Sequence, residues 1–525
     1  LGKLQEAEKS YRKAIEINPK YANAHLNLGT ILSDLGKLQE AEKSYRKAIK
    51  IKPNYAEAHY NLGIILSDLG KLQEANLAYK KSLEIEPNRI QRISTLIHNL
   101  SKLCMWDEIE KYSTYIHRLV VEGELVNPMD FMYIEDNPFN HLRRAVKYNK
   151  KFRNKEFTKI IYQKDKKINI GYFSSDYRNH PISHLLTRVL ELHDKSKFKI
   201  YAYSLSNIKD NYTERIKNAV FCYREISSLS DLEIVTVARN DKIDIAIDLN
   251  GYTKNNRRSI FCYRVAPIQI NYIGFPGSMG SKSYDYILAD KILIPEKNKK
   301  FYTEKVIYHP ISFMPNDNTK EISKHNFSKE ELGLPTDGFV FTCFNSIVKI
   351  TRKEFNIWMS LLLKVEGSVL WLMKPNETAQ KNLYSELNNI GINKERLVFA
   401  PRMELNDHLS RLKKADLFLD TFNYNAGTTA SDALWAGVPL ITMSGKSFSS
   451  RMGASILNAC NLNELITHSE KEYELLAYEL ANNKKRLESI RKKLNKKQNY
   501  SFFDSERYTI DLENIYLNIT KGNDQ

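Results

Sequence analysis

Two different hydrophobic patterns follow one another along this chain of 525 residues. In the first 89 residues, a motif of helix-forming character, Leu-Gly-Lys-Leu-Gln-Glu-Ala, begins at Leu1 and recurs from Leu35 and Leu69. From about Lys166, short apolar runs of strand length alternate with amphipathic segments of helix length. Such alternation predicts parallel sheets covered by helices on both faces. The chain therefore divides into a helical part and an α/β part.

The helical part has a period of 34 residues, which separates Pro19, Pro53 and Pro87. This period and its helix-pair pattern look like the tetratricopeptide repeat. Stacked repeats bury the apolar face that one helix pair leaves exposed, and they form a curved array with a concave groove. About two and a half repeats are present, so we expect further repeats upstream.

One pair of residues inside the repeats is a candidate peptide-binding feature. Asn27 and Asn61 occupy the same position in successive repeats, and Thr95 ends the series. An amide side chain can donate and accept at once, which suits an extended peptide backbone. The alternative is a pair of solvated surface residues.

The α/β part contains two blocks of alternating strands and helices. Strands are predicted at 168–173, 199–203, 243–248, 268–274 and 284–289, and after a polar stretch at 339–344, 369–373, 397–400, 417–420 and 440–443. Two blocks predict two Rossmann-like domains facing a cleft, with ligands beyond the carboxyl ends of the strands. The expected domains are repeats at 1–89, a helical adaptor or degenerate repeat at 90–158, Rossmann-like domains at 159–315 and 337–470, a linker at 316–336 and C-terminal helices at 471–525. The C-terminal part is expected to begin with one long charged helix over 471–497.

Composition narrows the class of protein. The net charge of +17 suggests nucleic acid, but lysine is spread over the whole chain, which is more typical of a solvated surface than of a phosphate-tracking patch. We therefore expect no nucleic-acid partner. The five cysteines form no metal-binding pair and no disulfide framework, so we expect a reducing, cytoplasmic setting. No apolar run approaches the roughly 20 residues that span a bilayer, and no signal peptide is evident.

The segment Asn425-Ala-Gly427-Thr428-Thr429-Ala-Ser-Asp432 follows an apolar run that ends at Asp420. It is typical of a strand, a glycine turn and the start of a helix. The N-terminus of a helix binds phosphate because its free N–H groups and its dipole both favour an anion. A nucleoside diphosphate would fit there. The alternative is a capped core helix in which Thr429 and Asp432 form a capping pair.

Three further segments lie at or after predicted strand ends, where α/β folds concentrate functional groups. They are Asn179-His180-Pro-Ile-Ser-His184, Asp248-Leu-Asn250-Gly-Tyr-Thr253 and Phe344-Asn345-x-x-x-Lys349. Together with Asp432-Ala-Leu-Trp-Ala-Gly-Val-Pro439 and the repeats, they resemble the O-linked N-acetylglucosaminyltransferase family, which includes SPINDLY-type O-fucosyltransferases and bacterial relatives. The resemblance covers nearly the whole chain.

That resemblance implies a GT-B fold and a metal-independent enzyme that transfers a sugar, with inversion, from a nucleoside diphosphate to Ser or Thr hydroxyls of proteins. UDP-N-acetylglucosamine is the expected donor, with no metal and no further cofactor. Lys349, Thr428 and Thr429 match residues at the diphosphate, where one well-placed cation contributes roughly 3–4 kcal/mol to lowering the barrier. The other expected substrate-binding positions are Asn345, His408, Gly427 and Asp432. Acceptor proteins or peptides would bind in the repeat groove.

His180 matches a histidine beside the reacting centre, where it is a candidate base for the acceptor hydroxyl or a group that only positions substrates. Asn250 and Thr253 match residues near the acceptor. Asp248 is a candidate to take a proton through water, or it simply caps a turn, as aspartates at strand ends commonly do.

The chain also departs from the family pattern. Gly427 stands where the family often has histidine, and Leu405 where animal members have lysine. The donor is therefore less firmly implied than the reaction, and GDP-fucose or UDP-glucose are alternatives. A catalytically inactive peptide-binding scaffold is an alternative of another class.

Overall fold

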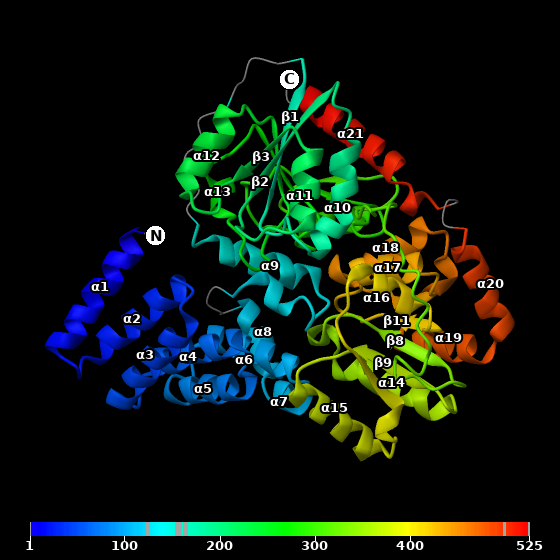
Figure 1. The fold of residues 1–525 in the computed structure, drawn as a ribbon, viewed down its shortest axis with the longest axis horizontal. Coiled ribbons are helices and arrows are strands. Elements are labelled where there is room, and N and C mark those ends of the chain that lie inside the picture. Colours follow the sequence, from blue (N-terminus) through cyan, green and yellow to red (C-terminus); the bar gives the residue numbers. More distant parts are fainter. Residues whose placement is uncertain (1, 122–125, 153–159, 161–165, 497–499, 523–525) are drawn as a thin grey trace. The chain divides into compact units, whose positions relative to one another are not determined.

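The computed structural model describes residues 2–121, 126–152, 160, 166–496 and 500–522 (Figure 1). The chain folds into two compact units. The first comprises Leu1–Val126 and Pro375–Glu386, and the second Asn127–Lys374 and Leu387–Gln525. The boundary at Val126 lies inside the segment 90–158 that the sequence suggests to be an adaptor.

The first unit is built from stacked helix pairs, as the 34-residue period predicts. Each pair packs closely because glycine faces a tyrosine of the following helix. A Cβ on Gly63 would lie 2.5 Å from the Tyr79 ring, and one on Gly29 would lie 2.6 Å from Tyr45. The helices of this unit are α1 (Gly2–Ile17), α2 (Ala22–Asp34), α3 (Leu38–Ile51), α4 (Ala56–Asp68), α5 (Leu72–Ile85), α6 (Ile90–Lys102), α7 (Trp106–Glu110) and α8 (Ser113–Val121).

One more helix joins this unit from far along the sequence. The start of α15 (Glu377–Ile390) packs at the end of the repeats, where Asn376 Nδ2 donates to the carbonyl of Lys102 at 2.8 Å and Asn382 Nδ2 donates to that of Leu103 at 2.7 Å. The end of the repeat array therefore packs against residues 375–386, which lie far along the sequence but belong to the same compact unit.

In the second unit, the first sheet has seven parallel strands in the order β3-β2-β1-β4-β5-β6-β7, which is the doubly wound arrangement. The strands are β1 (Ile168–Ser174), β2 (Phe198–Ser204), β3 (Cys222–Glu225), β4 (Ile245–Asp248), β5 (Ile268–Asn271), β6 (Tyr286–Ala289) and β7 (Lys305–Tyr308). The five central strands lie where the alternation predicts them. The edge strands β3 and β7 were not predicted, because they are partly exposed and do not form apolar runs.

Helices cover both faces of this sheet. One face packs on α10 (Pro181–Leu192), α11 (Asn211–Ala219) and α21 (Ser505–Gly522), and the other on α12 (Asp231–Asn240), α13 (Ser259–Cys262) and α9 (Pro138–Asn149), which follows the short helix η1 (Pro128–Phe131). The last helix, α21, comes after the second sheet in the sequence but packs on the first sheet, beside α10 (Figure 1). Buried tyrosine pairs fix it there, with Tyr272 and Tyr508 hydroxyls 2.6 Å apart.

The second sheet has six parallel strands in the order β10-β9-β8-β11-β12-β13. They are β8 (Val340–Cys343), β9 (Val369–Met373), β10 (Leu397–Ala400), β11 (Leu417–Leu419), β12 (Leu440–Met443) and β13 (Ile466–Thr467). All five predicted strands of this block are present, and only the two-residue edge strand β13 was missed. The accompanying helices are α14 (Arg352–Lys364), α16 (Leu405–Leu412), α17 (Thr428–Trp435), α18 (Met452–Ala459), α19 (Glu470–Asn482) and α20 (Lys484–Leu494), with short 3₁₀ turns at Ile347–Lys349, Lys394–Arg396, Ser449–Arg451 and Asn463–Leu465. Two further 3₁₀ turns lie at Glu296–Phe301, between β6 and β7 of the first sheet, and at Ser501–Phe503, before α21.

The expectation of one long helix over 471–497 is wrong. The chain breaks at Asn483, whose side-chain oxygen accepts from the N–H of Arg486 at 3.0 Å and so caps a second helix. Residues 497–499 lie outside the described part of the chain, as does the expected boundary at 158/159.

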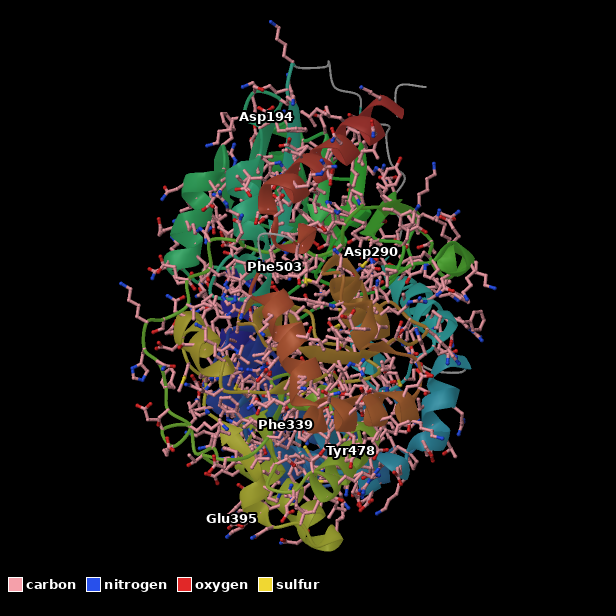
Figure 2. All side chains as sticks on the ribbon, turned by 90° about the vertical axis from the view of Figure 1, so that its right-hand side faces the viewer. Asp194, Asp290, Phe339, Glu395, Tyr478 and Phe503 are labelled. Atoms are coloured by element: carbon pink, nitrogen blue, oxygen red, sulfur yellow. The ribbon has the colours of Figure 1, made fainter. Side chains whose placement is uncertain are left out.

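The two sheet domains share buried polar contacts. Asp290, labelled in Figure 2, follows β6 and accepts from the Ser455 hydroxyl of α18 at 2.5 Å and from the N–H of Phe313 at 2.9 Å. Burial raises the pKa of this carboxyl. Within the residues described, no helix is both long enough and apolar enough to cross a membrane.

Candidate functional site

Lys349 lies in the loop after β8, in the short 3₁₀ turn Ile347–Lys349. Its half-buried ammonium donates to the carbonyl of Asn425 at 3.1 Å and lies 3.8 Å from the centroid of the Tyr424 ring. Burial lowers the pKa of Lys349 to about 8, against the opposing effect of the Asp420 carboxylate. The amine therefore contacts the loop that leads into α17 at Asn425, which lies three residues before Thr428.

That loop delivers the start of α17 without a side-chain cap. Gly427 is the N-cap residue and no side chain caps the helix. The Thr429 hydroxyl instead donates to Asn345 Oδ1 at 2.5 Å. The amide side chain that follows β8 thus contacts a hydroxyl in the first turn of α17. The expected alternative, a capping pair of Thr429 and Asp432, is wrong, because both side chains have other partners. The N–H of Ala430 donates to the Gly427 carbonyl at 3.0 Å, so within the first turn the N–H groups of Thr428 and Thr429 are the ones that need an acceptor from elsewhere.

Gly427 has a steric reason to be glycine. A Cβ at this position would lie 2.9 Å from the terminal methyl of Met452, with the sulfur of Met314 at 3.8 Å. A side chain at position 427 would therefore have to displace the end of Met452, whereas Met314 would be at an ordinary contact distance.

Asp420, at the end of β11, connects the parts of this loop and was missed as a site residue. Its fully buried carboxylate accepts from the N–H groups of Ala426 at 2.6 Å and Thr421 at 2.8 Å, from Thr442 Oγ1 at 2.7 Å and from Asn345 Nδ2 at 3.2 Å. Burial raises its pKa to about 6. An aspartate that directly follows a buried apolar strand is the signal that could have identified it.

Asp432 and His408 lie on neighbouring helices of the second sheet domain. The Asp432 carboxylate is 2.9 Å from the ammonium of Lys320. His408 Nδ1 accepts from the Arg411 guanidinium at 2.9 Å, and its ring centroid lies 5.2 Å from that of Phe344. Burial lowers the pKa of His408 to about 4, so the ring is neutral at pH 7. Lys320 and Arg411 were not identified from the sequence, although Arg411 lies one turn from His408.

In the first sheet domain, His180 is the N-cap residue of α10. Its Nδ1 accepts from the N–H of Ile182 at 3.3 Å, and its Nε2 lies 3.8 Å from Asp176. Burial lowers the pKa of His180, so the neutral ring is favoured. Because Nδ1 accepts, the hydrogen of the neutral ring is on Nε2, which is left as a donor.

Asn250 joins the loops after β1 and β4. Its amide oxygen accepts from the N–H of Ser175 at 2.8 Å, and its amide nitrogen donates to Asp176 at 2.8 Å and to Thr253 Oγ1 at 3.2 Å. Asn250 and Thr253 are therefore brought together with the loop that carries His180.

Asp248 shows the contacts of a turn-capping residue. Its carboxylate accepts from the N–H groups of Asn250 at 2.9 Å and Gly251 at 3.0 Å and from the Tyr284 hydroxyl at 2.6 Å. Burial raises its pKa. These contacts favour the capping alternative that the sequence left open.

The two sheet domains meet where these segments lie. Helix α10 of the first domain contacts α17 of the second. His184, one turn after His180, feels the charges of Asp432 and Lys320, and burial lowers its pKa to about 4. The predicted residues thus form two clusters, around His180 and Asn250 and around Lys349 and Thr429, on segments that contact each other.

The peptide-binding candidates lie in the first unit. Asn27 is exposed, and Asn61 lines a hollow of about 410 Å³ together with Tyr55, Tyr60, Arg89 and Arg92. Thr95 accepts or donates a hydrogen bond with the Tyr60 hydroxyl at 3.1 Å. In the part of the chain that the structure describes, no group of three or more His, Cys, Asp or Glu side chains is arranged to hold a metal ion.

Comparison with known proteins matches the model of glycosyl transferase family 41 to residues 145–330 and 319–512, and tetratricopeptide repeat models to residues 1–35, 29–70 and 56–89. A probable UDP-N-acetylglucosamine–peptide N-acetylglucosaminyltransferase, SEC of Arabidopsis thaliana, is 34% identical over 360 residues, which are 67% of this chain and 37% of that protein. A SPINDLY protein of Petunia hybrida, named for the same probable activity, is 31% identical over 67% of this chain and 38% of its own length. The chain thus spans less than half the length of these curated relatives.

A solved structure of a mutant O-GlcNAc transferase from Thermobaculum terrenum matches 99% of this chain and 95% of its own, with a TM-score of 0.75 and 25% identity. The likeness extends over the repeats and both sheet domains. It agrees with the two doubly wound sheets described above and with the arrangement called GT-B.

Proposed function

Because the chain belongs to glycosyl transferase family 41, we propose that it is an inverting, metal-independent glycosyltransferase that moves N-acetylglucosamine from UDP-N-acetylglucosamine to Ser or Thr hydroxyls of proteins. The observation that carries this proposal is the approach of the Lys349 ammonium to the loop before α17, 3.1 Å from the Asn425 carbonyl. The activity for which these relatives are named supports UDP-N-acetylglucosamine as the donor.

Lys349 and the start of α17 would bind the diphosphate. The ammonium now contacts a carbonyl and an aromatic face. The doubly charged diphosphate of the donor would attract it more strongly than either of these uncharged groups. The Thr428 and Thr429 hydroxyls and the N–H groups of the first helical turn add donors, and the helix dipole favours the anion. Asn345 would hold Thr429, and His408 and Asp432 would lie at the nucleoside.

Transfer would proceed by attack of the acceptor oxygen on the anomeric carbon. The bond from that carbon to the diphosphate breaks, its electron pair stays on the diphosphate oxygen, and the hydroxyl proton is released to water. Donors placed at the developing charge lower this barrier most when they are already oriented. Lys349 is such a group, since the loop holds it before substrate arrives.

His180 would act at the acceptor side as a hydrogen-bond donor. Its Nε2 carries the hydrogen in the tautomer that the Ile182 contact selects. Accepting a proton at Nδ1 would require that this contact be given up. Asn250 would fix the same loop through its bond to the N–H of Ser175, together with Thr253. Asp248 would cap the turn that carries Asn250.

Acceptor proteins would bind along the repeats, where Asn27 and Asn61 offer amide groups to a peptide backbone. The cysteines are free, and four of the five are buried, which fits a reducing compartment such as the cytoplasm.

The proposal is tested by incubating the protein with acceptor proteins and UDP-N-acetylglucosamine, UDP-glucose or GDP-fucose and measuring the added mass. We expect addition of N-acetylhexosamine and a loss of at least about 100-fold in rate for Lys349→Met. Lys353→Met is the matched control, because Lys353 is 73% exposed and pairs with Glu470. Addition of another sugar would show that the proposed donor is wrong. If no sugar is added and millimolar UDP or GDP does not raise the melting temperature, the result would favour the catalytically inactive peptide-binding scaffold.

A further inference from the structure

Lys320 is a buried lysine on the segment that joins the two sheet domains. Its side chain is only 3% exposed, and its ammonium lies 2.9 Å from the Asp432 carboxylate, whose side chain is 7% exposed. The ammonium also reaches the Ser431 hydroxyl at 3.4 Å, and the Lys320 carbonyl accepts from the indole N–H of Trp435 at 3.2 Å. One residue of the connecting segment thus makes three contacts with α17.

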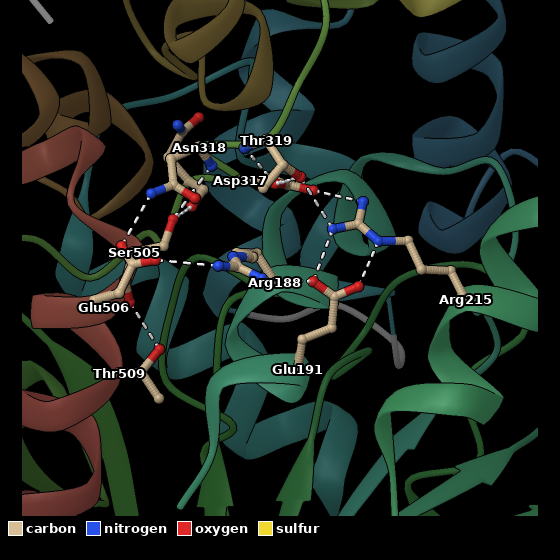
Figure 3. A network of polar contacts seen from close by, with 10 residues as sticks. Arg188, Glu191, Arg215, Asp317, Asn318, Thr319, Ser505, Glu506 and Thr509 are labelled. Carbon is tan, nitrogen blue, oxygen red and sulfur yellow. Dashed lines mark hydrogen bonds and ion pairs between the residues drawn. The ribbon is translucent and has the colours of Figure 1, made fainter. Parts of the chain in front are cut away.

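The connecting segment is fixed rather than loose at this point, although the sequence suggested a linker at 316–336. Figure 3 shows the polar network that fixes it to the first sheet domain and to α21. Asp317 accepts from Arg215 at 2.7 Å, and Arg215 also donates to Glu191 at 2.6 Å. Asn318 Nδ2 donates to Glu506 at 3.0 Å, which Arg188 also contacts.

The segment is also bonded to the second place where the chain passes between the domains. The Ser505 hydroxyl, at the start of α21, donates to the Asn316 carbonyl at 2.7 Å, and the N–H of Asn318 donates to the Ser505 hydroxyl at 3.2 Å. The Asn316 side chain in turn accepts from the Ser431 hydroxyl of α17 at 2.6 Å. Lys320 is therefore held on a braced backbone rather than on a mobile loop.

A buried carboxylate needs a partner, and removal of one partner leaves an uncompensated charge that the surroundings must accommodate by moving or by taking up a proton. At Asp432 that partner is Lys320. The direction in which the Asp432 carboxylate points is therefore fixed by a contact with a residue outside both sheets.

We propose that Lys320 is a positioning residue of the nucleotide site, which orients the Asp432 carboxylate for contact with the nucleoside diphosphate. This inference rests on the proposed function, in which Asp432 lies at the nucleotide. Lys320 itself need not touch the ligand, because its ammonium is already engaged by Asp432.

The test measures UDP affinity by calorimetry in Lys320→Met, Lys320→Arg, Asp432→Asn and the double variant Lys320→Met/Asp432→Asn. Lys320→Met should weaken UDP binding about tenfold, and Lys320→Arg should recover most of the affinity because it restores a cation. In the Asp432→Asn background, the Lys320→Met change should cause no further loss, since residues that act through one another are not additive. Arg144→Met is the matched control: it removes a cation buried to a similar degree beside Glu135, and it should lower stability without weakening UDP binding.

The outcomes separate this inference from the proposal it rests on. If Asp432→Asn weakens UDP binding but Lys320→Met, correctly folded, does not, the inference is wrong while the nucleotide site stands. If Asp432→Asn leaves UDP binding unchanged, the placement of the nucleotide fails and the inference fails with it. Should Lys320→Met not fold, the comparison of Asp432→Asn with the double variant still decides, because a further loss in the double variant would overturn the inference.

Discussion

At the scale of single residues, Lys349 is held in a state that a bound anion would change. Its pKa of about 8 lies below the ordinary value of 10.5 because burial disfavours the ammonium. A diphosphate beside Lys349 would add negative charge, which favours the ammonium form and raises the pKa of the amine. Its protonation should therefore be coupled to nucleotide binding.

The first prediction follows from this coupling. At pH 8.5 most of the free protein carries neutral Lys349, and UDP binding should raise its pKa and take up most of one proton. At pH 7 the amine is already charged and uptake should be close to zero. Calorimetry in buffers of different ionisation enthalpy measures the uptake, and Lys349→Met should abolish it. Equal uptake at both pH values, or uptake that persists in Lys349→Met, would contradict the assignment.

The second prediction concerns His180. If its Nε2 acts as a donor, His180→Gln should keep at least about tenfold more activity than His180→Ala, because the glutamine amide can also donate. A histidine that acts as the base would make both variants equally poor. The comparison is made on kcat for transfer, with UDP affinity as the control that should not change.

The residue types at the site were predictable only in part. Lys349 contacts the loop before α17 and Asn345 contacts Thr429 in its first turn, because parallel strands deliver their following loops to one edge of a sheet. The partners of these residues could not be read from the sequence. Asp420 and Lys320 have no motif of their own, and their roles come from burial and from contacts with residues 75 to 112 positions away.

At the scale of elements, the start of α17 depends on the space left by Gly427. The third prediction is that Gly427→Ala destabilises the protein by about 1–3 kcal/mol, since the new methyl group must displace the end of Met452. Urea denaturation measures this change. Because Met452 is buried, Met452→Ala alone should also destabilise the protein, but the loss in the double variant should be smaller than the sum of the two single losses. Full additivity of the two changes would show that the contact is not the cause.

The elements themselves were predicted best where they are buried. The central strands of both sheets form continuous apolar runs, and these were placed to within a few residues. The edge strands β3, β7 and β13 and the break between α19 and α20 were missed, because they depend on pairing at a sheet edge and on a single capping asparagine rather than on periodicity.

At the scale of the whole molecule, the proposed function assigns acceptor binding to the repeats and sugar transfer to the two sheet domains. The fourth prediction is that Asn27→Ala/Asn61→Ala raises KM for protein acceptors several-fold while leaving UDP affinity unchanged. Lys43→Ala is the control, since Lys43 is an exposed repeat residue outside the amide series. An unchanged KM would favour the alternative that both asparagines are only solvated surface residues.

The central claim is that Lys349 and the start of α17 together bind the diphosphate, and calorimetric titration of Lys349→Met with UDP and with uridine tests it most directly. The account predicts that Lys349→Met weakens UDP binding at least about tenfold and leaves the much weaker uridine binding unchanged, because only the phosphates contact the ammonium. Unchanged UDP affinity in a correctly folded Lys349→Met protein would contradict it.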